Sequence, residues 1–388
     1  MAEWKEISVK EAPFEIIDGD RGINYPSQDE FYDEGYCLFL STRNVRQTGF
    51  NFSDCQFITQ EKDELLRKGK LRRNDTVLTT RGTVGNLAFY GNDVPFENIR
   101  INSGMIIVRP DVTKMEAIFC YYIFRYMQKS FETFTSGSAQ PQLPIRDLNE
   151  MEISLPDLRE QRSIASILGS LDDKIDLLHR QNKTLEALAE TLFRQRFVEE
   201  ANDGWEVGKL GDVISIYDSM RRPVSSMERD KMKTGQLYPY YGAATIMDYV
   251  NDYIFDGEYI LMGEDGTVQT EDGYPILQLP TGKFWVNNHT HILQAKEPYS
   301  NFFMYIFLKK TNIAHIVTGA VQPKINQENL KSIEFPISPV EKVETFVSIT
   351  NDFWNKMNSN NSQITSLTQM RDKLLPKLMS GEVRVKIN

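Results

Sequence analysis

The sequence lacks the features of secreted, membrane-spanning and disulfide-stabilised proteins. Its 388 residues contain three cysteines, Cys37, Cys55 and Cys120, which are scattered through the first half. An odd number of separated cysteines gives no disulfide framework and is typical of a reducing cytoplasm. No apolar run is long enough to cross a bilayer. The first residues, from Met1, carry neither a basic nor an apolar segment, so we expect no secretory signal and a cytoplasmic protein.

Motifs that bind nucleotides or catalytic metals are also missing. The sequence has no Gly-x-x-x-x-Gly-Lys-Ser/Thr loop, no Gly-x-Gly-x-x-Gly after a strand, and no Cys-x-x-Cys or His-Glu-x-x-His pattern. His289 and His291 are two residues apart and would face one side of a strand, but no further metal ligands accompany them. We therefore predict no catalytic residues, no metal and no cofactor bound by this chain.

The sequence has fewer basic than acidic residues. Lys and Arg number 44 against 54 Asp and Glu, which gives a net charge of −10. This balance argues against binding nucleic acid through bulk charge, but it leaves room for local basic patches. Two basic clusters occur, and ordinary solvated surface charge explains each residue equally well. They consist of Lys68, Lys70, Arg72, Arg73 and Arg81, and of Arg221, Arg222, Lys231 and Lys233.

What the sequence does contain is an internal duplication. Segments of the first half recur in the same order about 180–186 residues later. A lag of this length indicates a duplicated domain, and a chain with internal pseudo-two-fold symmetry suits a ligand with two separated half-sites. The matched pairs are Arg81-Gly82-Thr83-Val84 with Asp265-Gly266-Thr267-Val268, Asn102 to Ile107 with Asn288 to Leu293, Tyr122-Ile123-Phe124 with Tyr305-Ile306-Phe307, and Gln140-Pro141 with Gln322-Pro323.

The pattern divides the chain into four segments. Residues 1–155 and 201–335 contain β-branched and apolar runs bounded by Gly and Asn, and each has one aromatic-rich helix. We predict two α/β (α+β) globules of similar fold from these segments. Residues 156–200 and 336–388 are predicted to be long helices that follow Pro156 and Pro339. The expected strands are 76–80, 105–108, 259–262 and 291–293, and the expected short helices are 116–126 and 301–309.

Each long helix carries a narrow apolar seam with heptad spacing, which requires a partner helix. An antiparallel coiled coil would satisfy both seams, and two unrelated helices packed on separate globules are the alternative. Asn182 and Asn360 fall near the middle of the seams, and we predict that they meet and fix the register. We expect Pro376 to kink or end the second helix, and Gly381 to stop it. The predicted interface residues are Leu171, Ile175, Leu178, Asn182, Leu185, Phe353, Met357, Asn360, Ile364 and Leu367.

At this point the sequence resembles a known family. Glu160-Gln161 followed by Ile164-Ala165-Ser166-Ile167-Leu168-Gly169-Ser170-Leu171-Asp172-Asp173-Lys174-Ile175, and the run from Arg371 to Val383, are similar to the two spacer regions of type I restriction–modification specificity subunits. The domain openings at Trp4 and Trp205 are similar as well. The resemblance covers nearly the whole chain. The second long helix departs from the pattern, because it has Glu341-Lys342 at the position that corresponds to Glu160-Gln161 in the first.

The resemblance implies a non-catalytic subunit of a larger complex. Residues 1–155 and 201–335 would be target-recognition domains, each reading one half of a bipartite double-stranded DNA sequence. The antiparallel coiled coil would set the spacing between the half-sites. The subunit would dock two adenine-methyltransferase (modification) subunits and further restriction/translocase subunits. S-adenosylmethionine, ATP and Mg are then expected on those partners.

Candidate DNA-binding residues lie in the duplicated turns. Glycine permits close backbone approach, Arg can contact phosphate or guanine, an acid can accept from cytosine, and Asn is the natural partner of adenine. Capping of a turn explains any single amide equally well. The predicted DNA-binding residues are Arg43, Asn44, Arg81, Gly82, Thr83, Arg100, Asn102, Ser103, Tyr240, Tyr241, Glu264, Asp265, Gly266, Asn287, Asn288, His289 and His291.

Two other functions fit the same sequence. One is a self-contained DNA methyltransferase or nuclease with an unrecognised active site, which binding of S-adenosylmethionine to the isolated chain would support. The other is a coiled-coil interaction module with no role at DNA. Loss of DNA protection on replacing Arg81 and Asn102, with the fold intact, would exclude it.

Overall fold

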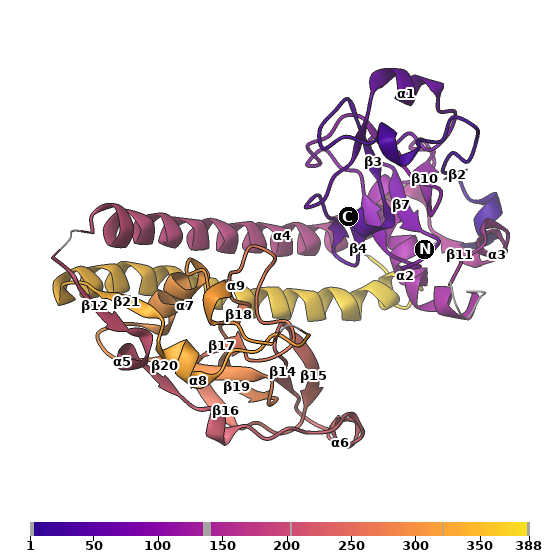
Figure 1. The fold of residues 1–388 in the computed structure, drawn as a ribbon. Helices are drawn as coiled ribbons and strands as arrows, with labels where there is room; N and C mark the ends of the chain where they lie inside the picture. The colour runs from indigo at the N-terminus through magenta and orange to yellow at the C-terminus, as the bar shows by residue number, and fades with distance from the viewer. Residues whose placement is uncertain (1–3, 135–140, 202–203, 320, 386–388) are drawn as a thin grey trace. The chain divides into compact units, whose positions relative to one another are not determined.

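The computed structural model describes residues 4–134, 141–201, 204–319 and 321–385. They form two compact units, which we call the first unit (Met1–Asp176 with Ile364–Asn388) and the second unit (Leu177–Gln363). Both long helices, α4 (Leu158–Arg194) and α9 (Val340–Met379), contribute to both units (Figure 1).

The first unit is built on a four-stranded sheet in the order β2–β10–β7–β8. Strand β10 pairs antiparallel with both β2 and β7, so that Ile106 lies opposite Asp18 and Leu78. A second sheet has the order β6–β3–β9, in which β3 and β9 are parallel, and β1 pairs with β11. The strands are β1 (Lys5–Ser8), β2 (Phe14–Asp18), β3 (Cys37–Leu40), β4 (Val45–Arg46), β5 (Gly49–Phe50), β6 (Phe57–Ile58), β7 (Thr76–Thr79), β8 (Leu87–Phe89), β9 (Ile99–Ile101), β10 (Met105–Pro110) and β11 (Glu152–Leu155), and the helices other than α4 and α9 are α1 (Gln60–Leu65), α2 (Ala117–Phe134) and α3 (Ile145–Asn149).

The second unit repeats this plan. Its main sheet has the order β13–β20–β17–β18, its second sheet runs β15–β14–β19–β16 with β14 and β19 parallel, and β12 pairs with β21. The strands are β12 (Glu206–Lys209), β13 (Ile214–Ile216), β14 (Tyr238–Tyr241), β15 (Ile246–Val250), β16 (Phe255–Glu258), β17 (Ile260–Gly263), β18 (Leu277–Gln278), β19 (Thr281–Val286), β20 (Thr290–Ala295) and β21 (Glu334–Ile337), and the helices are α5 (Leu210–Val213), α6 (Ser226–Lys231), α7 (Asn301–Lys309) and α8 (Gln327–Lys331).

The duplication predicted from the sequence is confirmed by the matching sheet orders and by a matching bridge in the two units. The isolated bridge between Arg81 and Gln142 in the first unit corresponds to that between Asp265 and Lys324 in the second. These four residues occupy matching places in the sequence alignment of the two halves. The α/β class with two sheet-rich domains of similar fold is therefore established.

Strand β10 shows why a continuous apolar run is buried on both faces. Ile106 and Val108 belong to the core that the first unit builds around α2, whereas Met105 and Ile107 belong to the core under the β6–β3–β9 sheet. Successive side chains of a strand point to opposite faces, so a strand between two cores reads as apolar throughout. The expected strand 105–108 is therefore found as the centre of the sheet.

The start of α4 is anchored in the first unit. Asp157 caps the helix, because its carboxylate accepts from the Arg159 and Glu160 amides at 2.9 and 3.0 Å. Glu160 is buried and accepts from Trp4 Nε1 at 3.1 Å and from the Arg384 guanidinium. In the second unit Lys342 instead lies over the ring of Trp205, 5.6 Å from its centroid. Both units thus tie their opening Trp to a helix start, with opposite charges.

The two long helices run antiparallel within each unit. In the first unit Arg371 donates to Asp172 at 2.7 Å, and Tyr122 donates to the same carboxylate at 2.6 Å. In the second unit the Asn360 side-chain amide donates to Asn182 at 2.8 Å, which confirms the predicted meeting of the seam asparagines. All ten predicted interface residues are buried or half-buried, while Leu177 and Leu188 beside the seam are exposed.

The ends of the helices follow their sequence signals in part. α9 starts at Val340, directly after Pro339, as expected. It continues through Pro376 and ends at Met379, and Gly381 adopts a φ of 73° that suits glycine at a helix terminus. α4 passes into a π-helical turn at Gln195–Glu199. Both helices lie within the predicted segments 156–200 and 336–388.

Aromatic packing seals the helices onto the second unit. Phe193 in the last turn of α4 and Phe197 in the π-helical turn that follows meet Phe303 of α7 and Phe346 of α9. The ring centroids of Phe197 and Phe346 are 5.2 Å apart, and those of Phe193 and Phe303 are 5.4 Å apart, both edge-on. Each such pair contributes about 0.5–1.5 kcal/mol beyond its buried area.

Among the described residues no helix is both long and apolar enough to cross a membrane.

Replacing Asn182 and Asn360 together by Leu is expected to leave the free energy of unfolding unchanged or to raise it by about 1 kcal/mol. The pair interrupts an apolar seam, and Asn360 Oδ1 is buried with no hydrogen-bond partner among the described residues. Asn360→Ala alone should instead destabilise, because it leaves a cavity and removes the donor to Asn182 Oδ1, while Asn182 Nδ2 still donates to Asn361. Urea unfolding of the full chain tests both, and a clear loss of stability in the double variant would contradict the expectation.

Candidate functional site

The duplicated turns of the first unit meet at one edge of its main sheet. Because β10 is antiparallel to β2 and β7, the start of β10 lies beside the ends of β2 and β7. The Arg81 amide donates to the Gly104 carbonyl at 3.1 Å, and the Leu143 amide donates to Thr80 at 2.9 Å. We call the segments 18–22, 80–86, 102–104 and 141–143 the first loop edge.

Glycine is required where two of these segments touch. A Cβ built on Gly19 would lie 2.3 Å from the Asn102 carbonyl oxygen, so any side chain there would force the loops apart. The sequence Asp18-Gly19-Asp20 therefore lets the end of β2 pass directly against the Asn102 turn. The result is a tightly packed edge with several polar side chains.

The second unit gathers the corresponding segments. The Glu264 amide donates to His289 at 2.9 Å, the Gly266 amide to Pro323 at 3.0 Å, and the Ile325 amide to Glu264 at 2.8 Å. We call the segments 217–221, 264–267, 287–289 and 323–325 the second loop edge. Residues that are far apart in the sequence are thus brought together in both units in the same way (Figure 1).

Most predicted DNA-binding residues of the first half lie on the first loop edge. Gly82 and Thr83 are exposed, Arg81 and Ser103 are half-buried, and the Arg81 guanidinium has no partner among the described residues. Asn102 accepts from the Gly104 amide through Oδ1 at 2.9 Å, which orients the side chain. These groups are placed to contact a ligand that approaches the edge.

Two other predicted residues of the first half have internal roles. Arg100 is 5% exposed; its guanidinium binds Asp63 at 2.5 Å and donates to the backbone of Asp63, Leu66 and Lys68. Asn44 is 3% exposed and donates to the carbonyls of Asn51 and Asp54. Arg43, its neighbour, is exposed. The structure supports a structural role for Arg100 and Asn44 in place of a contact with DNA.

In the second half, the exposed predicted residues are again the turn residues. Asn288 and Gly266 are exposed, and His289 is half-exposed with Nδ1 2.5 Å from Asp265 Oδ1. That contact orients the ring and uses the Asp265 carboxylate. Asp265 is therefore engaged by His289, which changes the expectation that it would accept directly from a base.

Other predicted residues of the second half are structural. Asn287 is 6% exposed and accepts from the His289 amide at 2.9 Å. Tyr240 is buried under the Arg229 guanidinium, and Tyr241 packs edge-on against Phe284. Gln322 is exposed, while Gln140 lies outside the described residues. Pro323 lies on the second loop edge, where its carbonyl accepts from the Gly266 amide, and the interpretation of the proline turns as rigid turns stays a prediction.

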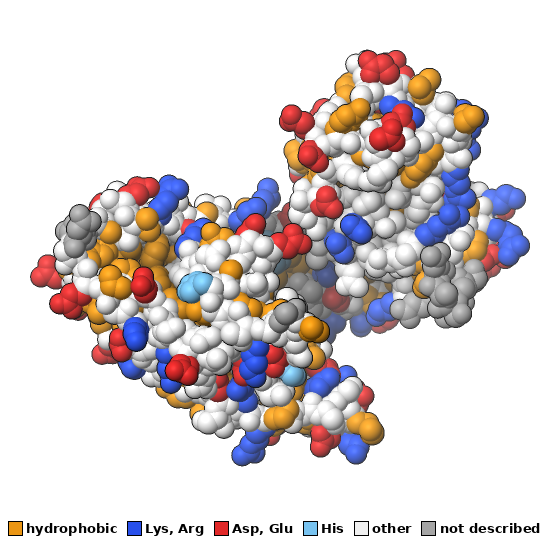
Figure 2. All heavy atoms as spheres, in the orientation of Figure 1, with side chains coloured by type: hydrophobic (Ala, Val, Ile, Leu, Met, Phe, Trp, Pro, Cys, Tyr) orange, Lys and Arg blue, Asp and Glu red, His pale blue; other side chains and the backbone are white. Residues whose placement is uncertain are grey.

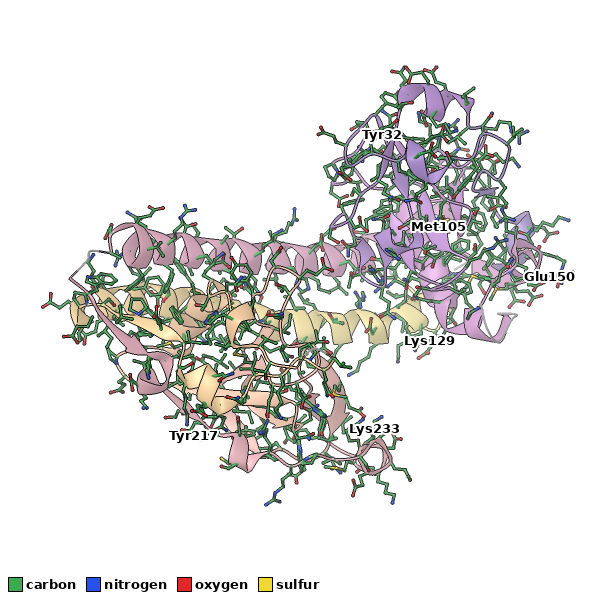
Figure 3. All side chains as sticks on the ribbon, viewed as in Figure 1. Tyr32, Met105, Lys129, Glu150, Tyr217 and Lys233 are labelled. Carbon is green, nitrogen blue, oxygen red and sulfur yellow. The ribbon has the colours of Figure 1, made fainter. Side chains whose placement is uncertain are left out.

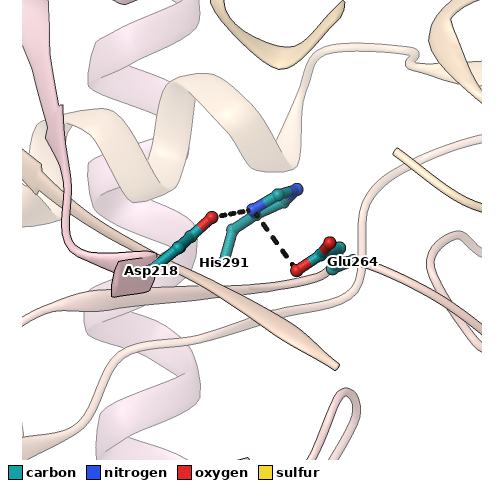
Figure 4. Close-up of side chains that lie close together, drawn as sticks. All are labelled: Asp218, Glu264 and His291. Carbon is teal, nitrogen blue, oxygen red and sulfur yellow. Dashed lines mark hydrogen bonds and ion pairs between the residues drawn. The ribbon is translucent and has the colours of Figure 1, made fainter. Parts of the chain in front are cut away.

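Behind the second loop edge lies a buried ionic network of Asp218, Arg221, Glu264 and His291, of which Figure 4 draws the two acids and the histidine. His291 Nδ1 is 2.6 Å from Asp218 Oδ2, and Nε2 is 2.9 Å from the Ile325 carbonyl. Arg221 pairs with both acids. Burial raises the pKa of Asp218, but the hydrogen bond from His291 and the Arg221 charge outweigh burial and hold that pKa below its ordinary value.

The network contains the side-chain types of a metal site. One donor atom from each of Asp218, Glu264 and His291 lies within 4.8 Å of the others. The Arg221 guanidinium, however, already supplies positive charge to both carboxylates. The prediction that His289 and His291 share one face of a strand is wrong, because β20 begins at Thr290, leaving His289 exposed on the turn and His291 fully buried.

Sequence reasoning missed this network. It treated Arg221 as surface charge and did not single out Asp218 or Gln327. Gln327 donates to Asp218 at 2.6 Å from a helix that follows over a hundred residues later. The one available signal was the Asp218-to-Arg221 spacing directly after a strand, which favours a local ion pair.

The basic clusters are only partly free. Arg73 donates to the Gly91 and Val94 carbonyls, and Lys70 pairs with the buried Asp63. Exposed Lys68 and Arg72 remain, along one groove that also includes acidic Glu15 and Asp18. Figure 2 shows Lys and Arg side chains interspersed with Asp and Glu over the face in view. The surface thus offers local basic groups, in keeping with the net negative charge.

The chain belongs to the type I restriction modification DNA specificity family, whose model matches residues 1–187 and 202–369. The MjaIX specificity subunit of Methanocaldococcus jannaschii is 25% identical over 348 residues, covering 80% of this chain and 77% of that one. The MjaVIII specificity subunit of the same organism is 22% identical over 391 residues, covering 91% and 87%. Both carry the name type I restriction enzyme.

A solved structure shares the fold. The type I restriction–modification S subunit from M. genitalium matches with a TM-score of 0.59 at 17% identity, covering 99% of this chain and 97% of that chain. The match spans both units and both long helices. The resemblance inferred from the spacer sequences is confirmed by the family model, which matches both halves of the chain.

Arg100→Met is expected to lower the free energy of unfolding by about 3 kcal/mol, because it leaves the buried Asp63 carboxylate with Lys70 as its one ionic partner among the described residues. Chemical denaturation of the full chain measures the loss. Arg43→Met, an exposed neighbour in the same unit, is the matched control and should change stability little. Equal stability of Arg100→Met and the unaltered chain would contradict the structural role.

Proposed function

We propose that this chain reads a bipartite double-stranded DNA sequence, using the first loop edge for one half-site and the second loop edge for the other. The observation that carries the proposal is the matched construction of the two edges. Asn102 on one edge and Asn288 on the other stand at corresponding positions of the duplicated sheets, and Arg81 and His289 add polar groups beside them. Side chains of these types read base edges in the major groove.

The subunit acts in this proposal as a non-catalytic scaffold. Modification subunits, two in number, and restriction subunits bind it and supply the chemistry together with S-adenosylmethionine, ATP and Mg. The net charge of −10 supports this division, because phosphate contacts dominate DNA affinity and the partners would provide many of them. We do not favour a self-contained methyltransferase or nuclease, since the family match extends over both halves of the chain.

The helix pair would set the distance between the half-sites. α4 and α9 each pass from one unit into the other without interruption, and the Asn182–Asn360 contact lies in the seam between them. A helix of the predicted length, about 48 Å from Ile164 to Arg196 at 1.5 Å per residue, exceeds one turn of DNA, about 34–36 Å. The pair is therefore long enough to act as a ruler.

Substitutions on one edge are expected to affect one half-site only. Arg81→Ala or Asn102→Ala should weaken discrimination in the first half-site, and Asn288→Ala in the second, by about 1–3 kcal/mol per lost base contact. Methylation mapping of DNA modified by the complete complex measures both half-sites at once. Arg146→Ala, which removes an exposed arginine on α3, is the control and should leave the motif unchanged. Loss of discrimination in both half-sites from a single change would contradict the proposal.

Inserting one heptad into each long helix beside the Asn182–Asn360 pair is expected to lengthen the unspecified gap between half-sites while the specified bases stay the same. A heptad preserves the seam, so the helices should still pair. The same methylation mapping reads the gap directly. A modified motif with an unchanged gap would reject the ruler.

A further inference from the structure

The second loop edge is supported from behind by a buried network of ion pairs, whereas the ion pair described on the first loop edge, Arg21 with Asp18, is exposed. The side chains of the buried ionic network are 4%, 15%, 13% and 0% exposed for Asp218, Arg221, Glu264 and His291. Glu264 directly precedes Asp265, which orients His289. The network is therefore one residue away from the exposed groups of the edge.

Arg221 joins three segments of the edge. Its Nε donates to the Asp218 carbonyl at 2.9 Å, and its Nη1 donates to the Thr290 and Asn288 carbonyls at 2.9 and 3.1 Å. The same Nη1 also contacts the Glu264 carboxylate. One guanidinium thus holds the end of the β13 segment, the turn before β20 and the loop after β17 in a single arrangement. Hydrogen bonds with a charged donor contribute more than neutral ones.

His291 and Asp218 extend this arrangement to the last segment of the edge. The Ile325 carbonyl can only accept, so His291 Nε2 carries the proton in that 2.9 Å hydrogen bond. Asp218 accepts from the Ile292 amide at 2.9 Å and from Gln327 at 2.6 Å. The segment 323–325 and the start of α8 are thereby tied to the main sheet through side chains.

Two positions of the network have uncharged counterparts in the first unit, where the buried Asp20 carboxylate accepts from the backbone amides of Gly22, Arg67 and Lys68. By the matched alignment, Met105 stands for His291 and Thr80 for Glu264. Met105 is fully buried in an apolar core (Figure 3), and the Thr80 hydroxyl donates to the Gly104 carbonyl at 3.2 Å. Arg21 makes an exposed pair with Asp18 and reaches Ser103 only at 3.5 Å. The two edges have the same backbone arrangement but are stabilised by different side-chain contacts.

We propose that Arg221, with Asp218, Glu264 and His291, positions the second loop edge for base recognition, so that the specificity of the second half-site depends on this network and that of the first does not. This inference rests on the proposed function. The network touches no DNA in the proposal and acts through the Asn288 carbonyl and the Asp265–His289 pair. Removing it frees the edge to accept wrong bases.

The test is Arg221→Met in the full chain, expressed with its modification subunits. Methylation mapping should show methylation at sites with a wrong base in the second half-site rising about tenfold or more relative to the intended sites. The first half-site should stay strict. The double variant Arg221→Met/Glu264→Thr removes both partners of the ion pair and places threonine, the residue type of Thr80 in the first unit, at position 264. It replaces the single variant if that variant does not fold.

Arg229→Met is the matched control. Arg229 forms an ion pair with Asp248 at 3.1 Å in the same unit, with side chains 14% and 16% exposed, but it contacts no residue of the second loop edge among its described interactions. Thermal unfolding should show comparable losses of stability for Arg221→Met and Arg229→Met. A merely destabilised protein methylates fewer sites with the same motif, so only Arg221→Met should relax the second half-site.

Three results overturn the inference. The first is unchanged base specificity of the second half-site in both Arg221 variants. The second is an equal loss of that specificity in Arg229→Met. The third is a loss of specificity in both half-sites together. Failure of the proposed function is seen separately, in the unaltered complex, as modified DNA without a bipartite motif. In that case the inference also fails, because the unaltered complex has no second half-site whose specificity the network could control.

Discussion

The pairing of two narrow apolar seams is the contact on which the rest of the structure depends. Neither seam could be buried by its own helix, and in each unit α4 and α9 cover one another and a sheet domain together. Leu168 and Leu378 lie in the core of the first unit, and Phe193 and Phe346 in that of the second. Because the same two helices enter both cores, the folding of each domain and the pairing of the helices are one process rather than two.

The seam also shows how a protein combines stability with register. An apolar seam alone permits shifts of one heptad, since every layer resembles the next. The Asn182–Asn360 hydrogen bond at 2.8 Å is satisfied in one register only. At the edge of the first unit, Asp172 adds a second constraint, because it accepts from both Tyr122 and Arg371. The apolar contacts therefore stabilise the pairing of the helices, and polar contacts at two places along the pair fix its register.

Sequence reasoning predicted the parts of the fold that depend on periodicity and repetition. The heptad seams, the meeting of Asn182 with Asn360 and the strand at 105–108 all follow from local spacing. The second sheets, β6–β3–β9 and β15–β14–β19–β16, did not, because their short strands pair across long and irregular loops. The turns that make up the two loop edges were found because duplication marks them twice.

Side-chain roles at the edges were harder to predict than positions. Arg100 and Asn44 have the residue types of a DNA contact, but burial assigns them to internal partners. Exposure depends on the three-dimensional fold, which composition does not encode. The buried ionic network was missed for the same reason, since Asp218, Glu264, His291 and Gln327 are separated along the chain and meet only when two strands and a helix come together. Duplication identifies shared geometry, whereas differences between the copies identify specialisation.

The first unit takes part of its core from the last residues of the chain. Leu375, Leu378 and Met379 are buried there, and Arg384 pairs with Glu160. During synthesis the hydrophobic interior of the first unit can therefore close only after residues 375–384 have left the ribosome. A chain that ended before these residues would leave that interior exposed, and exposed apolar surface of this kind is prone to aggregate.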